Sequence, residues 1–149
     1  MSTAADCAKN FPDDQTVGDE VALLPRVPPR HFYFDRRLGR IRPSSAAFED
    51  DRDGDPMSVY REDIIISEQG TVERVMFGHE EYGLVALTAG QFRSRQQTIF
   101  SDRLPEESSH TKVCGPKTDS NRRWFAKQAE WTRPPPQPGL SAGTQGEKK

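Results

Sequence analysis

The apolar residues of this chain fall into short blocks separated by polar turns, and most of the blocks have the length of a strand. Strands are predicted at 21–24, 31–34, 57–60, 84–88, 98–100 and 111–114. The block at 84–88 is almost continuously apolar and is flanked by Gly83 and Gly90. This pattern predicts a central strand that is buried on both faces.

Helical spacing is clearest near the end of the chain. Trp124, Phe125, Gln128 and Trp131 form one stripe in the segment 118–131, and Pro134 follows it. The segment 67–79 also has apolar residues at helical spacing, but it contains residues that suit a strand equally well. We favour a helix there, and we expect single helical turns at 89–95 and, unless it is a tight loop, at 43–48.

These elements predict an α+β fold, with a small mixed sheet and one to three short helices. Residues 1–20 are small, polar and acidic without periodicity, which predicts a disordered tail. Residues 21–133 are expected to form a single α+β domain. Residues 134–149 are rich in Pro, Gly, Ser and Lys and predict a second disordered tail.

Charge is unevenly distributed, although the net charge is only -2. Residues 26–42 contain six arginines and a single acidic residue, residues 49–55 are acidic, and residues 112–133 are basic. Such blocks commonly pair with each other inside one fold. Whether the arginine-rich segment is paired internally or forms a binding face stays open, and the net charge argues against nucleic acid as a partner.

The two cysteines, Cys7 and Cys114, are too few for a disulfide framework. We therefore expect two reduced thiols in a cytoplasmic protein. No apolar run approaches the roughly 18 residues that cross a bilayer, so no membrane association is expected.

No motif predicts a catalytic or metal site. Residues 49–60 have the alternating acidic residues of a calcium loop, but Tyr60 occupies the twelfth position, where a Glu is needed. His110 and Cys114 form half a zinc site at best. On a strand they would lie about 13 Å apart, too far for a nucleophile and its base.

Several polar residues are candidates for ligand binding. Thr88 ends the buried strand, where a ligand can meet backbone amides. The arginines of residues 26–42 have the aromatic residues 31–34 interleaved among them, a combination that holds single-stranded nucleic acid, although strand alternation would split the set between two faces. The candidate residues are Arg26, Ser44, Ser45, Ser58, Thr88, Arg93 and His110.

Four segments carry a resemblance to known proteins. They are RPSSAAF at 42–48, MSVY at 57–60, GLVALTAG at 83–90 and LPEESSHTKVCG at 104–115, followed by Lys117 and Thr118. In this order they resemble a family of small uncharacterised bacterial proteins. The resemblance implies a bacterial, cytosolic, single-domain protein, and it brings no activity, cofactor or catalytic residue.

Two functions are consistent with these observations. The first is a non-catalytic binding or accessory module that acts on a protein or an anionic small ligand. The alternative is an enzyme that binds a phosphate-bearing ligand such as NAD, with a loose ADP-ribosyltransferase-like pattern. That alternative requires Arg26, Ser44 or Ser45, and Glu106 or Glu107 to converge in one concave pocket.

Overall fold

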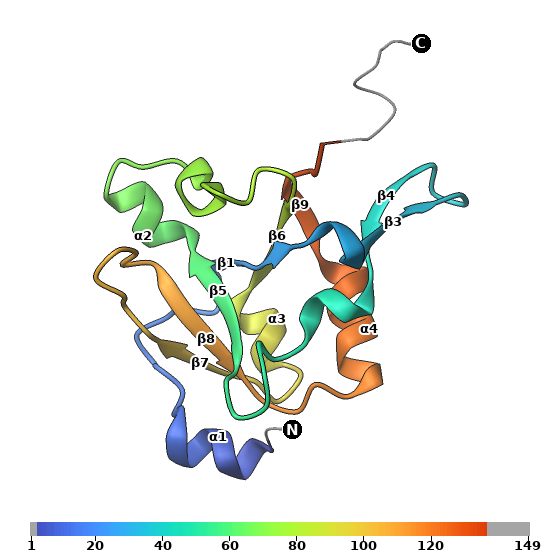
Figure 1. The fold of residues 1–149 in the computed structure, drawn as a ribbon. Coiled ribbons are helices and arrows are strands. Elements are labelled where there is room, and N and C mark those ends of the chain that lie inside the picture. The colour runs from blue at the N-terminus through green and yellow to red at the C-terminus, as the bar shows by residue number, and fades with distance from the viewer. Residues whose placement is uncertain (1–2, 137–149) are drawn as a thin grey trace.

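An antiparallel sheet forms the centre of the protein in the computed structural model, which describes residues 3–136 (Figure 1). Its strands follow the order β7-β8-β5-β1-β6, and both β2 and β9 also pair with β6. The strands are β1 (Ala22–Leu24), β2 (Arg26–Val27), β5 (Met57–Arg61), β6 (Gly83–Thr88), β7 (Thr98–Ser101), β8 (His110–Cys114) and β9 (Glu130–Arg133). With the helices described below, this confirms the predicted α+β class.

The strand β6 is central, as its apolar sequence predicts. Leu84 and Val85 are fully buried, and β6 pairs with β1, β2 and β9. Pro25 separates β1 from β2 without breaking their common path beside β6, since its carbonyl accepts a hydrogen bond from the Val85 amide at 3.2 Å. A proline lacks an amide donor, so it interrupts the ladder at this point.

Four α-helices and three 3-10 helices surround the sheet among the described residues. They are α1 (Ala4–Asn10), α2 (Glu62–Ser67), α3 (Ala89–Arg93), α4 (Asp119–Gln128), η1 (Pro29–His31), η2 (Ser45–Phe48) and η3 (Val72–Met76). The turns expected at 43–48 and 89–95 are η2 and α3. None of the helices in residues 3–136 is long and apolar enough to cross a membrane.

Two of the predicted helices differ from the structure. The segment 67–79 forms only the short 3-10 helix η3. The helix expected over 118–131 ends at Gln128, and Trp131 lies in β9 opposite Val85. The Trp131 indole nitrogen donates to the Ile41 carbonyl at 2.8 Å, so a contact distant in sequence replaces the last helical turn.

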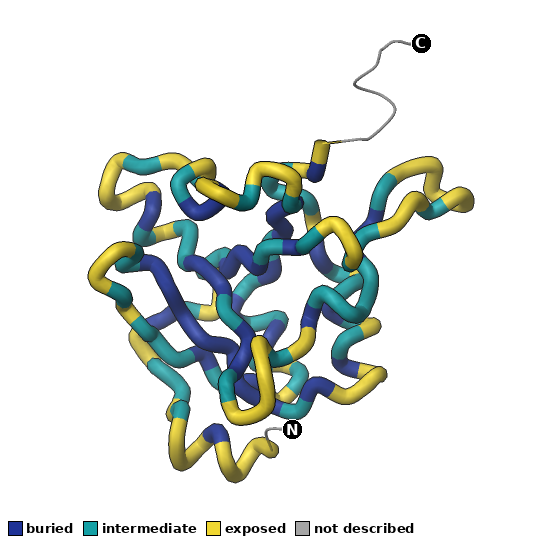
Figure 2. The backbone as a smooth tube through the Cα atoms, viewed as in Figure 1, coloured by how far each residue is buried: buried dark blue, intermediate teal, exposed yellow. Residues whose placement is uncertain are grey.

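Each face of the sheet has its own apolar cluster, and the inner strands β5, β6 and β8 are mostly buried (Figure 2). On one side, Phe48 of η2, Phe92 of α3 and Phe125 of α4 pack together and are fully buried. On the other side, Ile65 of α2 and Met76 of η3 pack against β6 and its neighbours. The helices therefore cover both faces of a small sheet.

Residues 3–20 are ordered, whereas the sequence predicts a disordered tail over 1–20. Thr3 caps α1, and its hydroxyl accepts a hydrogen bond from the Asp6 amide. Val17 is 1% exposed and belongs to the main core. Arg93 forms ion pairs with Asp13 at 3.1 Å and with Asp19 at 2.6 Å. The acidic residues that suggested disorder are thus partners of the domain.

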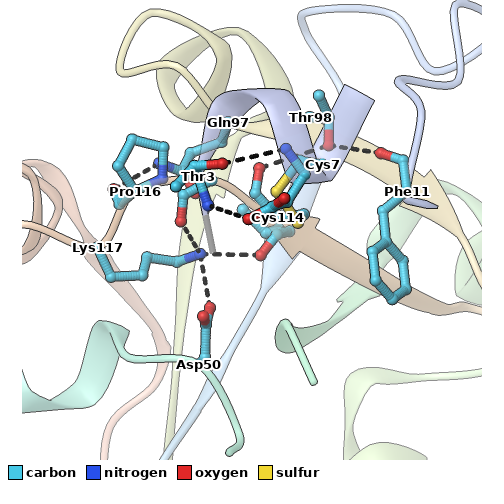
Figure 3. The surroundings of a disulfide bond; sticks show 12 residues. Thr3, Cys7, Phe11, Asp50, Gln97, Thr98, Cys114, Pro116 and Lys117 are labelled. Carbon is cyan, nitrogen blue, oxygen red and sulfur yellow. Dashed lines mark hydrogen bonds and ion pairs between the residues drawn. A yellow bond between two sulfur atoms is a disulfide. The ribbon is translucent and has the colours of Figure 1, made fainter. Parts of the chain in front are cut away.

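A disulfide between Cys7 and Cys114 joins α1 to β8, with the two Cα atoms 5.7 Å apart (Figure 3). The expectation of two reduced thiols is therefore wrong. Both cysteines are almost completely buried, and the neighbouring Thr98 hydroxyl donates to the Phe11 carbonyl at 2.7 Å. Counting cysteines does not reveal such a link, because the N-terminal segment must first pack on the sheet.

A separate hairpin projects from the body of the protein (Figure 1). It consists of β3 (Phe32–Asp35) and β4 (Arg40–Pro43). Gly39 has a φ of +68° in its turn, a conformation that favours glycine. One carboxylate oxygen of Asp35 accepts hydrogen bonds from the amides of Arg37 and Leu38, which fixes the turn. The disordered tail predicted for 134–149 lies outside the described residues from 137 onward.

Candidate functional site

A groove of about 870 Å³ lies between the β3–β4 hairpin and α4, and we call it the basic groove. Arg37, Arg40 and Arg42 line it from the hairpin, and Arg123 and Lys127 line it from α4. Asp35 is the acidic residue of its wall, and its carboxylate is engaged with the amides of the turn. The predicted candidates Ser44 and Ser45 also line this groove.

The register of the hairpin decides which side chains reach the groove. Tyr33 pairs with Arg42 and Asp35 pairs with Arg40, and all four line it. Phe34 pairs with Ile41, and strand alternation directs these two to the opposite side. The predicted division of arginines and aromatic residues between two faces is therefore present. Tyr33 lies on the groove side of the hairpin, together with Arg40 and Arg42.

Arg42 holds the two walls of the groove together. It is 7% exposed, and its guanidinium donates to the carbonyls of Ala126 at 2.8 Å and Ala129 at 3.2 Å. The last carbonyls of a helix lack partners within the helix and carry partial negative charge, so a cation is favourable there. Arg42 thus positions the hairpin on the C-terminal end of α4.

The other four cations of the groove have no carboxylate partner within residues 3–136. Arg37, Arg40, Arg123 and Lys127 are all exposed, and the ion pairs of the described chain involve other residues. Within the segment 26–42, Arg37 and Arg40 are therefore not neutralised by a carboxylate of the described residues. Cations that are gathered but unpaired favour an anionic ligand.

The second basic segment is neutralised by residues 49–55, which we call the acidic turn. Lys117 lies 2.9 Å from Asp50, and Lys112 lies 2.8 Å from Asp55. Arg122 lies 3.7 Å from Glu49. The prediction that acidic and basic blocks pair internally is correct for this part of the chain.

Burial affects the two lysines of this cluster differently. Burial lowers the pKa of Lys117, and the Asp50 carboxylate opposes that shift only in part. Burial also disfavours the charged form of Lys112, but hydrogen bonds and charge from Asp55 and Asp51 hold its pKa above the usual range. Both pairs are structural, because their charges are satisfied within the fold.

Ser58 and His110 lie next to each other, on neighbouring strands β5 and β8. The Ser58 hydroxyl is 3.1 Å from Nε2 of His110, and Nδ1 of His110 is 3.1 Å from a carboxylate oxygen of Asp102. This order of groups is that of a serine nucleophile, its base and an orienting acid. The strand register pairs Ser58 with Lys112 and Tyr60 with His110, and this proximity was not predicted from the sequence.

The hydrogen bonds around Ser58 argue against its being an activated nucleophile. Its hydroxyl has one proton, and the closest acceptor is the Asp51 carboxylate at 2.6 Å. The Lys112 ammonium donates to the Ser58 hydroxyl oxygen at 3.0 Å. With Asp51, Lys112 and His110 around it, the hydroxyl uses its full hydrogen-bonding capacity. We therefore assign these residues to a closed polar cluster that joins the acidic turn to β8.

The remaining candidates have structural contacts. Arg26 donates to the Val75 carbonyl at 3.0 Å and lies over the Tyr60 ring. Thr88 caps α3 in a reciprocal arrangement with Gln91. Arg93 binds the N-terminal segment through the ion pairs described above. The Ser44 hydroxyl donates to the His31 carbonyl at 3.0 Å.

The convergence required for NAD binding is not observed. Arg26 lines a pocket of about 280 Å³ with Ser58, whereas Ser44 and Ser45 line the basic groove. Glu107 lines a third pocket, where it pairs with Arg74 at 2.7 Å. Burial would raise the pKa of Glu107, but hydrogen bonds from Ser109 and Arg74 keep it below the usual range. Glu107 is thus a partner of Arg74.

Sequence reasoning did not select Arg123 and Lys127 as site residues. They lie on the outer side of the predicted helix 118–131, and this outward position was the sequence feature that could have pointed to them as site residues.

Residues 3–136 contain no group of three or more His, Cys, Asp or Glu side chains arranged to hold a metal ion. Comparisons with protein-family models, curated proteins and solved structures find no match for this chain.

Proposed function

We propose that this protein is a non-catalytic binding module that holds an anionic ligand in the basic groove. The observation that carries the proposal is the set of four exposed cations, Arg37, Arg40, Arg123 and Lys127, that line one groove without a carboxylate partner in residues 3–136. They come from a hairpin and a helix far apart in the sequence.

The construction of the groove supports binding with little rearrangement. Arg42 fixes β4 to the end of α4, and the Trp131 indole donates to the Ile41 carbonyl from β9. The two walls are therefore held by long-range hydrogen bonds before a ligand arrives. Preorganised donors reduce the entropy cost of association. Arginine is well suited to this role because its guanidinium can donate two parallel hydrogen bonds to a carboxylate or phosphate.

The bacterial origin and cytoplasmic location expected from the sequence stay predictions. The Cys7–Cys114 disulfide favours an oxidising compartment, since thiols in the cytosol are normally kept reduced. Counting free thiols in protein alkylated at the moment of cell lysis tests the location.

Retention on a heparin column tests the proposed function. The protein has a net charge of -2, so it is retained at neutral pH only if a local basic surface outweighs the overall charge. We expect retention of the native protein and its loss in the double variant Arg40→Glu/Lys127→Glu. The matched control is Lys9→Glu/Arg103→Glu, which reverses two exposed cations outside the groove.

The two variants have the same net charge, so the comparison isolates the position of the reversed cations. Retention of the control together with elution of the groove variant in the flow-through supports the proposal. Equal retention of both variants, or no retention of the native protein, contradicts it.

A further inference from the structure

We infer that the ligand of the basic groove is a single-stranded nucleic acid. This inference rests on the proposed function and adds the chemical class of the ligand. Its basis is one aromatic ring placed among unpaired cations. Tyr33 is 49% exposed and lines the groove with Arg40 from the paired strand. A basic groove with a stacking ring is the arrangement that holds unpaired bases and their phosphates.

Large exposed apolar side chains gather on the hairpin. Five are found among residues 3–136, and Tyr33, Phe34 and Leu38 belong to the hairpin. An acidic peptide would neutralise the arginines but offers no flat face to a phenol ring. A nucleotide offers both a negative charge and a flat face, because its phosphate pairs with a guanidinium while its base stacks on the ring. The combination therefore favours nucleic acid over an acidic protein segment.

The dimensions of the groove favour a single strand over a duplex. Its volume of about 870 Å³ is that of a site for a compact ligand, within the range of roughly 300–1,000 Å³ typical of small-molecule pockets. The bases of a duplex stack on each other and are not available to Tyr33. A flexible strand can place one or two bases in the groove while its backbone follows the arginines.

The net charge of -2, which argued against nucleic acid, does not describe the groove. Several acidic residues are paired away from the groove: Asp50 and Asp55 pair with Lys117 and Lys112, and Asp13 pairs with Arg93. The wall of the groove has five cations and one carboxylate. A strand therefore meets a locally positive surface on a weakly negative protein.

The test is fluorescence anisotropy with a fluorescein-labelled oligothymidylate of about twelve nucleotides, a length within the usual range for single-strand sites. Four phosphate contacts give a slope of about -2.8 in log affinity against log salt, so affinity falls about fifty-fold between about 50 and about 200 mM NaCl. We expect Tyr33→Ala to weaken binding about tenfold at constant salt, and Tyr33→Phe to retain it.

Phe34→Ala is the matched control, because Phe34 is a neighbouring exposed ring on the other side of the same strand. Equal losses in Tyr33→Ala and Phe34→Ala, or no loss in either, contradict stacking in the groove. A labelled polyglutamate peptide of the same length forms the second arm. Binding of the peptide without the oligonucleotide overturns this inference and leaves the proposed function intact. Binding of neither overturns both.

Discussion

Two basic segments of this protein have opposite surroundings. In residues 112–122, Lys112, Lys117 and Arg122 each lie within 4 Å of a carboxylate of the acidic turn. In the hairpin, Arg37 and Arg40 have no such partner among residues 3–136. The two segments look alike in the sequence, and only the fold separates a neutralised cluster from an open one. This difference indicates which charges serve stability and which are free for a ligand.

The neutralised cations and the exposed cations of the groove also differ in the free energy of desolvation that folding requires. A buried cation loses its hydration, and the loss is recovered only while its partner and its hydrogen bonds stay in place. Lys117 is 5% exposed and depends on Asp50 together with two backbone carbonyls. The exposed arginines of the groove keep their water and need no partner to fold. Substitutions in the two regions should therefore have very different effects on stability.

The largest effect is expected from Asp50→Asn. This change leaves the buried Lys117 ammonium without its carboxylate, and we expect a loss of about 3 kcal/mol in the free energy of unfolding near neutral pH. Urea denaturation at about pH 7 measures it, with the slope of the transition as a check on two-state unfolding. A loss below about 1 kcal/mol would show that the pair is not effectively buried.

The same variant has a characteristic pH dependence. Burial lowers the pKa of Lys117 below its ordinary value of 10.5, and Asp50 opposes this shift. Between the folded and unfolded pKa values the unfolded chain binds more protons, so raising the pH stabilises the folded state. Without Asp50 the folded pKa falls further. The deficit of Asp50→Asn should therefore shrink between about pH 7 and about pH 9.5, and a constant deficit would contradict this origin.

Removal of the disulfide should have the next largest effect. The double variant Cys7→Ser/Cys114→Ser loses a link across 107 positions of sequence, and we expect a loss of about 2 kcal/mol in the free energy of unfolding. Its affinity for the oligothymidylate should be unchanged, because both cysteines lie outside the basic groove. A parallel loss of affinity would show that the basic groove depends on the disulfide. Native protein with and without reductant provides the control.

The smallest effect on stability is expected from Arg37→Gln. The arginine is exposed and unpaired, so the free energy of unfolding should change by less than about 0.5 kcal/mol. Its affinity for an anionic ligand should decrease and depend less on salt. Urea denaturation and anisotropy on the same preparation measure both quantities. A stability loss comparable with that of Asp50→Asn would remove the distinction between open and neutralised charge.

The elements that were predicted correctly depend on local signals. The apolar run of β6 and the glycines beside it are visible within eight residues. The end of α4 was placed wrongly because it depends on Arg42, which lies 84 residues away from the carbonyl of Ala126 that it binds. The order in residues 3–20 was missed for the same reason, since Cys7 and Asp13 find their partners beyond residue 90.

Part of the lining of the basic groove was selected from the sequence. Ser44 and Ser45 line the groove, and the arginine-rich segment supplies three of its cations. Arg123 and Lys127 were recognised as an outer helix face without a role, because the sequence does not show which hairpin lies against that face. Ser58 and His110 were selected separately. Their contact depends on the register of β5 and β8, which local patterns do not determine.

The disulfide also determines how the protein would respond to mechanical tension. If the chain is pulled at residues 3 and 136, the force passes from Cys7 directly to Cys114, and the loop between them is shielded. Besides residues 3–7, only the segment with α4 and β9 can extend, so β9 leaves its partner β6 and the helical wall of the groove separates while the strands β1 to β8 stay inside the shielded loop. Reduction would release the loop of 107 positions, at roughly 3.5 Å per residue. Loss of the α4 wall, and of a ligand held in the groove, would therefore precede unfolding of the strands β1 to β8.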